Sequence, residues 1–427
     1  MKYYQEIRNN FMKIKINHIT KIEGHAGFEA ELYSGKVKNA LIRTKEGIRL
    51  VEGILQGRSY HEAFVITARI CGVCPVVHNL TAIKALENAL GVKPSALTID
   101  LRKILENAQI IQSHALHTYF MALEDYFGLD SAFDLIKKFP AVSQKALRVR
   151  DFANRVIDKI GGRTIHPLRT QVGGFTKLPS KNELKSLLSE IPEVKNNILA
   201  IINVYKKIKF PDFERKTEFL GLSSKKEYAI YEGHIKTTDG LDIPPKKFEN
   251  KIEEIQIPFQ MSKRAYYKGK SYMVGALARL HLNRSKLNKE AKKLIKYLPA
   301  FPNYNTFYNL FAQAIELMQC TEEIEKLIER VLKMKFGEPS VKYKIKAGCG
   351  VGAVEAPRGT LYHYYELDSK GYIKNCNIIT PTVQMLANLE ADLKQWLSEK
   401  KFKKFDRDKK IKMLIRAYDP CMTCATH

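Results

Sequence analysis

The chain of 427 residues has few cysteines, no long apolar run and a deficit of acidic charge. Seven cysteines are an odd and sparse set for this length, which argues against a disulfide scaffold and favours metal-bound or free thiols in a reducing compartment. No window approaches about 18 uninterrupted apolar residues, so we predict no transmembrane helix and no membrane partner. The first residues contain no apolar segment of the kind that a signal peptide needs.

The charge is strongly unbalanced, with 71 lysines and arginines against 45 acidic residues and a net charge of +26. Much of it lies in lysine-rich stretches with helical character at 284–296 and 400–412. Such a balance suits nucleic acid, a solvated lysine-rich surface or a face that meets an acidic protein partner. Aromatic residues do not interleave with the basic runs and no nucleic-acid motif is present. We therefore expect no nucleic-acid partner.

The pattern of apolar residues predicts one mainly α catalytic domain over 1–427, with small β patches. Alternation broken by glycines predicts a β meander at about 13–45. Helical periodicity dominates about 60–335, although 210–280 is rich in turn signals and is predicted to be irregular. A second β patch near 341–379, with strands at 341–346 and 360–379, is followed by C-terminal helices, so that this part spans about 340–427.

Two helices are predicted together with their ends. One spans Pro75 to Leu90, with proline in the first turn and Gly91 just beyond the last turn. Asp100 is predicted to cap a longer helix that runs to about Phe127. The other helices are predicted at 141–160, 182–208, 304–335, 384–403 and 407–417.

The most informative motif is a pair of CxxC sequences near opposite ends of the chain. Cys71 and Cys74 form the first pair, and Cys421 and Cys424 form the second, three residues before the terminal His427. A zinc ribbon normally brings its second pair back within roughly 15–20 residues, whereas here almost the whole chain lies between them. A site formed by both ends of the chain lies at the centre of the fold. We therefore predict that the bound metal carries out the function of the protein.

The residues around the first pair favour thiolate chemistry. Cys74 stands just before a predicted helix N-terminus, where unpaired amides stabilise a thiolate. His78 lies one helical turn further on and faces the same side, from which it can donate a hydrogen bond to a sulfur. Soft thiolates select zinc, cuprous copper, iron–sulfur clusters or nickel. By spacing alone, a structural four-thiolate zinc or cluster site is an equal alternative.

Four motifs taken together resemble the large subunit of nickel–iron hydrogenases, in the order in which that family has them. Further stretches are similar to the soluble cytoplasmic branch that includes the archaeal sulfhydrogenases. The family motifs are Ile22-Glu23-Gly24-His25, the run 69–78 (Arg-Ile-Cys-Gly-Val-Cys-Pro-Val-Val-His), Glu355-Ala356-Pro357-Arg358-Gly359 and Asp419-Pro420-Cys421 through His427. The branch stretches are 113–117, 173–179 and 273–276.

The resemblance implies a nickel–iron centre with cyanide and carbon monoxide on the iron. Cys71 and Cys421 match the terminal nickel ligands, and Cys74 and Cys424 match the thiolates that bridge nickel and iron. The resemblance also implies a structural magnesium ion, whose ligands match Glu52, the backbone carbonyl of Ile378 and His427.

The resemblance also implies the catalytic groups. Glu23 matches the carboxylate that relays protons, and Arg358 matches the arginine over the open metal position. Pro381-Thr382 matches the segment whose hydroxyl binds a cyanide. Heterolytic cleavage of dihydrogen needs a soft Lewis-acidic metal and a nearby base, for which both Cys421 and Arg358 are candidates. Glu23 would then pass the proton outward.

Several positions have an ordinary structural alternative. Glu23 is also compatible with a salt bridge at a turn, Glu52 with a solvated helix acid, and Asp419 with a turn before proline, although we expect Asp419 to form a salt bridge near the site. Ser113 stands where several members of the family have an aspartate, so Arg358 is expected to have one carboxylate fewer. His114 and His117 share a helix face, either as donors near the metal or as core histidines.

The remaining cysteines, Cys320, Cys349 and Cys376, are isolated and are expected to be buried free thiols. Their spacing supports no iron–sulfur cluster in this chain, so electrons must leave through a partner. The resemblance implies an iron–sulfur small subunit, diaphorase-type flavin and iron–sulfur subunits that reduce NAD(P), a possible maturation protease and a cytoplasmic location. The alternatives are a methanogen-type deazaflavin-reducing or disulfide-reductase-linked enzyme and, in another class, a zinc-binding nucleic-acid module.

Overall fold

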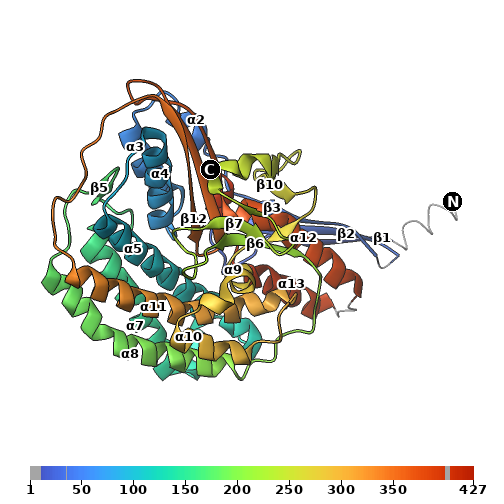
Figure 1. The fold of residues 1–427 in the computed structure, drawn as a ribbon. Helices are drawn as coiled ribbons and strands as arrows, with labels where there is room; N and C mark the ends of the chain where they lie inside the picture. The colour runs from blue at the N-terminus through green and yellow to red at the C-terminus, as the bar shows by residue number, and fades with distance from the viewer. Residues whose placement is uncertain (1–10, 35, 400–403) are drawn as a thin grey trace.

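The structure is a computed structural model that describes residues 11–34, 36–399 and 404–427. The N-terminal residues, predicted to carry no signal peptide, lie outside this part, as do the start of the lysine-rich run 400–412 and the end of the predicted helix 384–403. The predicted class, mainly helical with small sheets, is confirmed (Figure 1). Within the described residues, none of the helices combines the length and the apolar character that crossing a membrane requires.

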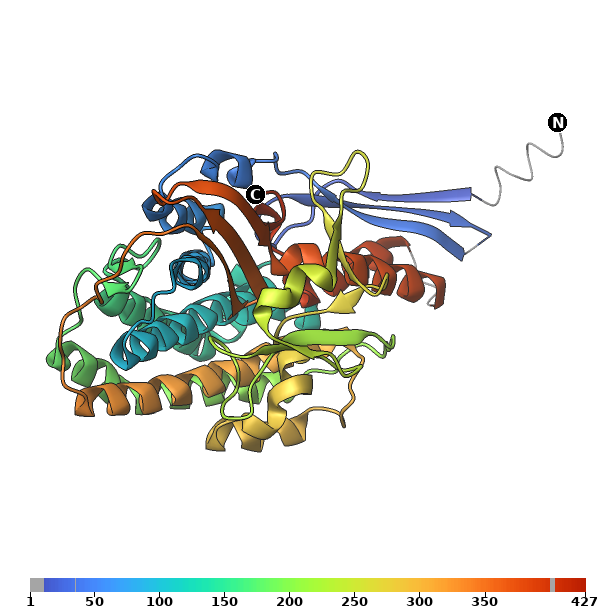
Figure 2. The same ribbon diagram turned by 45° about the horizontal axis from the view of Figure 1, so that its top comes forward.

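The predicted meander forms an antiparallel sheet of three strands in the order β1-β2-β3. These strands span Phe11–Ile16, Ala26–Tyr33 and Lys36–Thr44. Alternation buries one face of the sheet, including Ile14 and Ile16 of β1. The outer half of the sheet projects past the helices, as Figure 2 shows, while its inner end reaches the turn that carries Glu23.

Helix α4 (Pro75–Leu90) has the predicted bounds, and Gly91 closes it at φ 70° with its N–H on the carbonyl of Glu87. The next helix differs from the prediction. α5 (Ala96–Ala115) is capped by Ser95, whose hydroxyl accepts from the amide of Thr98. The predicted cap, Asp100, lies inside the helix and pairs with Arg330 instead.

The helix predicted to reach Phe127 changes its geometry after Ala115. A π-helical turn (η2, Leu116–Met121) follows, and then a 3-10 turn (η3, Leu123–Phe127). π-Helical turns insert an extra residue and are frequent at functional sites. The turn lies where α5 approaches the C-terminal segment.

Four long helices, α5, α7, α8 and α11, pack side by side into the main helical layer (Figure 1). The last three span Pro140–Gly161, Lys181–Tyr205 and Asn309–Lys333, close to the predicted ranges. Further helices are α2 (Val51–Leu55), α3 (Tyr60–Thr67), η1 (Ala68–Ile70), α6 (Ala132–Lys138), η4 (Pro245–Asn250), α9 (Ala276–Asn283), η5 (Arg284–Lys286), α10 (Lys289–Leu294), η6 (Ile295–Tyr297), η7 (Thr306–Tyr308), α12 (Pro381–Glu399), α13 (Lys404–Ala417) and α14 (Met422–Ala425).

The region 210–280, predicted to be irregular, contains short strands joined by turns. A four-stranded sheet has the order β11-β6-β7-β8, and β9 and β10 form an antiparallel pair. The strands are too short for alternation to be visible in the sequence. They are β6 (Glu218–Ser223), β7 (His234–Thr237), β8 (Asp242–Ile243), β9 (Ile252–Ile255), β10 (Arg264–Tyr267) and β11 (Tyr272–Met273), and a separate small pair is β4 (Thr170–Gln171) with β5 (Gly174–Phe175).

The second β patch is an antiparallel sheet of β12 (Gly348–Ala356), β13 (Gly359–Leu367) and β14 (Ile373–Ile379). The strand predicted at 341–346 is wrong: this stretch alternates apolar and polar residues but belongs to no strand and is largely exposed. The first strand is instead the glycine-rich β12, which lies against α4.

Glycines let β12 approach the backbone of α4 more closely than any side chain allows. Added Cβ atoms at Gly348, Gly350 and Gly352 would lie 2.3, 2.2 and 2.3 Å from the backbone oxygens of Ala89, Ala85 and Thr81. This close contact fixes the hairpin of β12 and β13, whose turn carries Arg358, against the helix that begins at Cys74.

Replacing Gly350 by alanine is expected to destabilise the protein by about 1–3 kcal/mol, because the added methyl group meets fixed backbone atoms. Thermal unfolding of the purified protein measures the change. Gly337→Ala is the matched control, because no atom lies within 4 Å of its added Cβ. Equal unfolding midpoints for the two variants would contradict the close packing.

Candidate metal centre

The four cysteine sulfurs of the two CxxC pairs meet in one buried cluster. All four ligand atoms lie within 4.8 Å of one another. Cys71 Sγ lies 3.5 Å from Cys421 Sγ, and Cys74 Sγ lies 3.4 Å from Cys424 Sγ. These separations are far longer than a disulfide bond, and the cysteines are free thiols. The prediction that the two ends of the chain close one site is thus met by the geometry.

Local structure presents each sulfur to the centre. Cys74 occupies the N-cap position of α4 but caps no amide with its side chain, so its sulfur faces the cluster. Cys71 Sγ accepts a hydrogen bond from the amide of Val73 at 3.2 Å. Cys421 precedes the short helix α14, and Cys424 lies within it.

Backbone hydrogen bonds thread the C-terminal segment into the core. Glu23 and Cys421 form an isolated parallel bridge, and the amide of Met422 donates to the carbonyl of Glu23 at 2.9 Å. Gly24 has φ 75°, and a Cβ there would lie 2.9 Å from the Cβ of Met422. The amide of Arg49 donates to the carbonyl of Thr426 at 3.0 Å. The last seven residues are therefore held by segments close to the N-terminus.

The donor set fits a soft cationic metal group. Burial raises the pKa of Cys421 and contact with Cys421 raises that of Cys424, whereas the hydrogen bond from Cys421 lowers the pKa of Cys71. Four buried thiols in contact cannot all ionise without compensating positive charge. Soft cations of the nickel and iron type supply that charge and prefer sulfur donors.

Glu23 lies beside the cluster, half-buried. The thiol of Cys421 donates to Glu23 Oε2 at 2.9 Å, and Thr423 donates to the carboxylate from its hydroxyl at 2.6 Å and from its amide at 3.1 Å. Thr423 was not anticipated from the sequence, although it lies inside the second CxxC pair. Next to Gly24, His25 and Glu46 form a partly exposed pair with Nδ1 and Oε1 2.7 Å apart.

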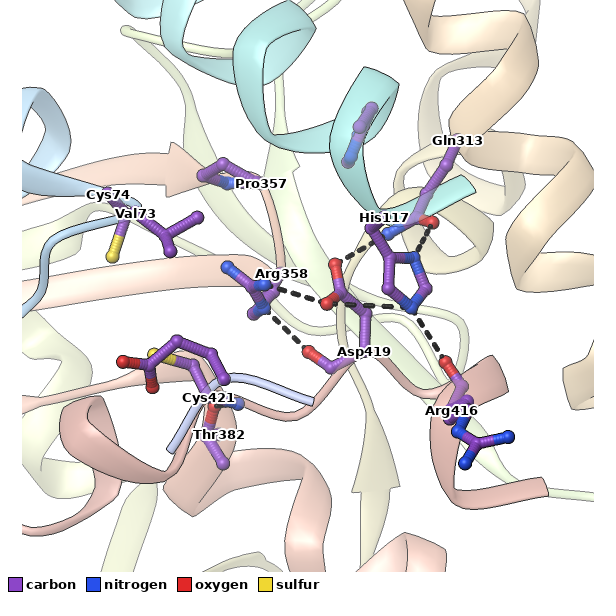
Figure 3. A network of polar contacts seen from close by, with 12 residues as sticks. Val73, Cys74, His117, Gln313, Pro357, Arg358, Thr382, Arg416, Asp419 and Cys421 are labelled. Carbon is purple, nitrogen blue, oxygen red and sulfur yellow. Dashed lines mark hydrogen bonds and ion pairs between the residues drawn. The ribbon is translucent and has the colours of Figure 1, made fainter. Parts of the chain in front are cut away.

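Arg358 lies beside the sulfurs and is held by Asp419 (Figure 3). Its Nε donates to the carbonyl oxygen of Asp419 at 2.6 Å, and its Nη2 donates to Oδ1 at 2.7 Å. Burial alone would lower the pKa of Arg358, but Asp419 and the nearby sulfurs raise it well above its usual value. The guanidinium is therefore a fixed cation next to the cluster.

The other oxygen of the Asp419 carboxylate accepts from Gln313 Nε2 at 3.0 Å. Gln313 Oε1 lies 2.8 Å from Nδ1 of His117, and Nε2 of that ring lies 2.9 Å from the carbonyl oxygen of Arg416 (Figure 3). Ser113 is buried, and its hydroxyl has no partner among the described residues. As predicted, Asp419 forms a salt bridge near the site.

Two histidines and a tyrosine line the side of the cluster near Cys424. His78 Nε2 lies 3.6 Å from Cys424 Sγ, the predicted contact with a sulfur. Its Nδ1 lies 3.4 Å from Nε2 of His363, and Nδ1 of His363 lies 3.0 Å from the hydroxyl of Tyr365. Burial lowers the pKa of His78 to about 3, so the ring is neutral. His363 and Tyr365 were not anticipated because no spacing in the sequence connects β13 with α4.

A buried ionic cluster supports the turn that carries Arg358. Arg279 donates to both oxygens of Glu316 and to Glu355, and also to the carbonyls of Ala356 and Pro357. All three charged side chains are fully buried. His114 pairs with Glu316 at 2.8 Å and is a core histidine rather than a neighbour of the sulfurs.

Pro381 and Thr382 begin α12 beside the sulfurs, and the hydroxyl of Thr382 accepts from the amide of Cys421 at 3.0 Å. A small cavity of about 10 Å³ lies between these residues and Cys74, Arg358 and Cys424. Its other walls are Ala356, Pro357, Leu361, His78 and Cys421. The space is thus small and largely apolar.

The three residues predicted to hold magnesium lie together near the C-terminus. Glu52 Oε1 accepts from the amide of Ile378 at 2.8 Å, and Nε2 of His427 lies 2.8 Å from the carbonyl oxygen of Ile378. Lys263 Nζ is 3.9 Å from Glu52 Oε2. Oxygen and imidazole donors therefore converge here from α2, β14 and the chain terminus.

The three isolated cysteines are far from the cluster in sequence and are free thiols. Cys320 and Cys376 are buried as expected. Cys349 is exposed, which corrects the expectation of burial, because the neighbouring glycines face α4 and turn its side chain outward.

The sequence matches the family model described as nickel-dependent hydrogenase over residues 49–145 and 221–427. It is 32% identical to the alpha chain of sulfhydrogenase 1 from Pyrococcus furiosus, with 99% of each chain covered. It is 31% identical to a chain of the F420-non-reducing hydrogenase from Methanothermobacter marburgensis, over 97% of this chain and 95% of that one. Among solved structures, the chain is similar to an NAD+-reducing [NiFe]-hydrogenase with a TM-score of 0.89 and 28% identity, covering 98% of this chain and 100% of that one.

The ionic cluster around Arg279 predicts acid sensitivity. Burial would raise the pKa of Glu316, but Arg279 and His114 bring it down to about 2. A depressed carboxyl pKa stabilises the fold above the unfolded pKa, so this contribution is complete above about pH 5 and is lost as the pH falls towards 2. Urea unfolding across this range measures it.

Glu316→Gln is expected to cost about 3–5 kcal/mol at neutral pH, because an amide nitrogen replaces one of the two oxygens that accept from Arg279 and leaves two buried donors facing each other. The variant is also expected to flatten the pH dependence. Glu193→Gln, which breaks the exposed pair with Arg148, is the control and should change stability by less than about 0.5 kcal/mol. Equal decreases in the free energy of unfolding for the two variants would show that the buried cluster stabilises the protein no more than an exposed ion pair does.

Proposed function

The chain belongs to the nickel-dependent hydrogenase family as a large subunit, and we propose that it is the catalytic subunit of a cytoplasmic nickel–iron hydrogenase that oxidises dihydrogen reversibly to protons and electrons. The observation that carries the proposal is the buried cluster of four sulfurs from both ends of the chain. We propose that residues 1–427 act as one catalytic unit, because the turn of Glu23, α4, β13, α12 and α14 all contribute residues next to this cluster.

When bound, the nickel–iron group supplies the soft Lewis acid that heterolytic cleavage of dihydrogen requires. Cys71 and Cys421 would serve as terminal nickel ligands, and Cys74 and Cys424 as bridging thiolates. Three residues support the iron side: Thr382 offers a hydroxyl, and Pro381 and Leu361 add apolar walls to the small cavity. The apolar walls and the single hydroxyl of this lining suit small, weakly polar ligands, which supports cyanide and carbon monoxide on the iron.

Of the two candidate bases, the sulfur of Cys421 is better supported than Arg358. Asp419 fixes the guanidinium of Arg358 as a cation, so it has no free lone pair with which to accept a proton. Cys421 Sγ is 2.9 Å from Glu23 Oε2, which gives a proton on that sulfur a direct acceptor. Glu23 then passes the proton towards the partly exposed pair of His25 and Glu46. Arg358 holds positive charge beside the reacting position.

We propose a magnesium ion at Glu52, the carbonyl of Ile378 and His427. A carboxylate and a carbonyl are the hard donors that magnesium prefers, and water would complete its octahedron. The ion would tie the terminal residue to α2 and β14, and thereby hold Cys424, whose carbonyl lies 2.7 Å from Nδ1 of His427.

Electrons are proposed to leave through an iron–sulfur small subunit, because the cysteines outside the cluster are isolated and cannot hold an iron–sulfur cluster by their spacing. Exposed apolar residues on the segments around the first CxxC pair offer a docking surface for that partner. They include Leu50, Ile54 and Val65, exposed by 67, 47 and 42%.

The likeness to an NAD+-reducing hydrogenase supports NAD(P) as the final acceptor, and with this acceptor we propose diaphorase-type flavin and iron–sulfur subunits. The likeness to F420-non-reducing relatives supports, as the second candidate, a hydrogenase that does not reduce a deazaflavin, and we propose disulfide reduction as its link. Hydrogen-dependent reduction of NAD+, NADP+ or a deazaflavin by the native complex separates these acceptors. We also propose that a maturation protease acts on this chain during assembly of the enzyme.

Infrared spectroscopy of the native complex tests the proposed function. Bands from cyanide and carbon monoxide on iron are expected, together with nickel and iron in equal amounts. Zinc alone, without these bands, would instead support a structural zinc module. Cys74→Ser is expected to abolish hydrogen uptake, and retained uptake would remove the bridging role of Cys74.

Glu23→Gln is expected to lower hydrogen uptake and hydrogen–deuterium exchange by at least about 100-fold, because the amide cannot relay a proton. Nickel and iron contents and the infrared bands should stay at the level of the unsubstituted complex. Glu62→Gln, at a surface pair with Arg58, is the control. Unchanged exchange in Glu23→Gln would assign the proton path to other residues.

A further inference from the structure

We propose that Gln313 and His117 are positioning residues that hold Arg358 in place through the carboxylate of Asp419. The inference rests on the proposed function, because it concerns the arginine beside the metal group. Neither residue touches a sulfur, and their effect would pass entirely through Asp419.

The position of Arg358 depends on a single neighbour. Among the described residues, both of its hydrogen bonds go to Asp419, one to the carbonyl oxygen and one to Oδ1. Its third nitrogen, Nη1, is buried and has no partner in the same part of the chain. The hydroxyl of Ser113 is likewise buried and unpaired there. Rotation of the Asp419 side chain would therefore remove one of the two hydrogen bonds that orient the guanidinium.

The carboxylate of Asp419 needs a second hydrogen bond to keep its orientation. Its backbone has φ 54°, an uncommon conformation for a residue other than glycine, and its Oδ1 is already used by Arg358. Gln313 Nε2 donates to the other oxygen at 3.0 Å. A carboxylate only accepts, so the amide nitrogen of Gln313 must face Asp419 and its amide oxygen must face the other way.

That amide oxygen faces His117, which fixes the orientation of the amide. Nδ1 of the ring lies 2.8 Å from Gln313 Oε1, and Nε2 lies 2.9 Å from the carbonyl oxygen of Arg416. Nε2 is also 3.6 Å from Asp419 Oδ1. Both ring nitrogens face oxygen acceptors. A proton on Nδ1 donates to Gln313 Oε1, and donation to the carbonyl of Arg416 as well requires the doubly protonated ring. The residues from Arg416 through His117 and Gln313 to Asp419 are all buried.

His117 lies in the π-helical turn η2, three residues beyond His114. His114, the last histidine before the turn, pairs with Glu316 on α11, whereas His117 pairs with Gln313 one turn earlier on the same helix. The side chain of Asn309 also donates to the carbonyl of Ala417 at 2.9 Å, which ties the start of α11 to the segment before Asp419. The contact of η2 with α11 therefore sets the orientation of Arg358.

The test uses the purified complex with Gln313→Leu. We expect nickel and iron contents and the number of cyanide and carbon monoxide bands to be retained, the cyanide bands to shift, and kcat for hydrogen–deuterium exchange to fall by about 100-fold. Such a loss is typical of a reacting group displaced by about 1 Å. The KM for dihydrogen should change much less than kcat.

A double-mutant cycle with Arg358→Lys separates positioning from general destabilisation. If Gln313 acts through Arg358, adding Gln313→Leu to Arg358→Lys lowers kcat no further. Gln319→Leu is the matched control: it is buried on the same helix and accepts from the amide of Asn288 at 2.6 Å, away from Asp419. This variant should keep the bands and kcat of the unsubstituted complex.

If Gln313→Leu does not fold, Gln313→Glu provides a second test, because the glutamate side chain has the same shape as glutamine. Its kcat should fall steeply with rising pH, as the introduced carboxyl ionises beside Asp419 and repels it, and should recover at low pH, where the protonated carboxyl donates. His117→Gln, which loses the anchor on Arg416, should shift the cyanide bands in the same direction.

Several results would overturn the inference while the proposed function stands: an unchanged kcat and unchanged bands in metal-loaded Gln313→Leu, independent losses in the double-mutant cycle, or a loss in Gln313→Glu that does not vary with pH. Absence of cyanide and carbon monoxide bands from the unsubstituted complex would instead remove the proposed function itself.

Discussion

Four sulfurs meeting in a dry interior are the constraint on which the rest of the structure depends. Buried thiols at 3.4 to 3.5 Å repel one another once ionised, and only a soft cation compensates that charge. The pairs come from 350 residues apart, so the chain must bring its two ends together at its centre. The bridge between Glu23 and Cys421 does this with backbone hydrogen bonds, and the side chain of Glu23 adds hydrogen bonds with Cys421 and Thr423.

The chain stabilises the surroundings of the sulfurs with buried charge that is paired almost completely. Arg279, paired with Glu316 and Glu355, donates to the carbonyls of the turn that carries Arg358. Asp419 pairs with the guanidinium of Arg358. Buried ion pairs are poor sources of net stability, but breaking one is costly, so such clusters fix geometry. Gln313 and His117 fix Asp419 in turn, so the contact of η2 with α11 is part of the site.

Much of the fold could be predicted where the local signal was strong. The helix from Pro75 to Leu90 carries its own start and stop in proline and Gly91, and the meander shows clear alternation. The strand predicted at 341–346 was wrong because alternation there has no partner strand, whereas β12 carries glycines that weaken any strand signal. The cap at Asp100 was wrong because Ser95 offers a competing cap one turn earlier.

What the sequence by itself determined is the set of sulfur donors and the motifs around them, since each CxxC pair is a local pattern that needs no partner to be read. Only the tertiary structure decided how Arg358 is held, because Gln313, His117 and Asp419 come from three distant segments and no periodicity links them. Hydrogen bonds between such segments depend on how the segments pack, and here they join the π-helical turn after Ala115, helix α11 and the C-terminal segment.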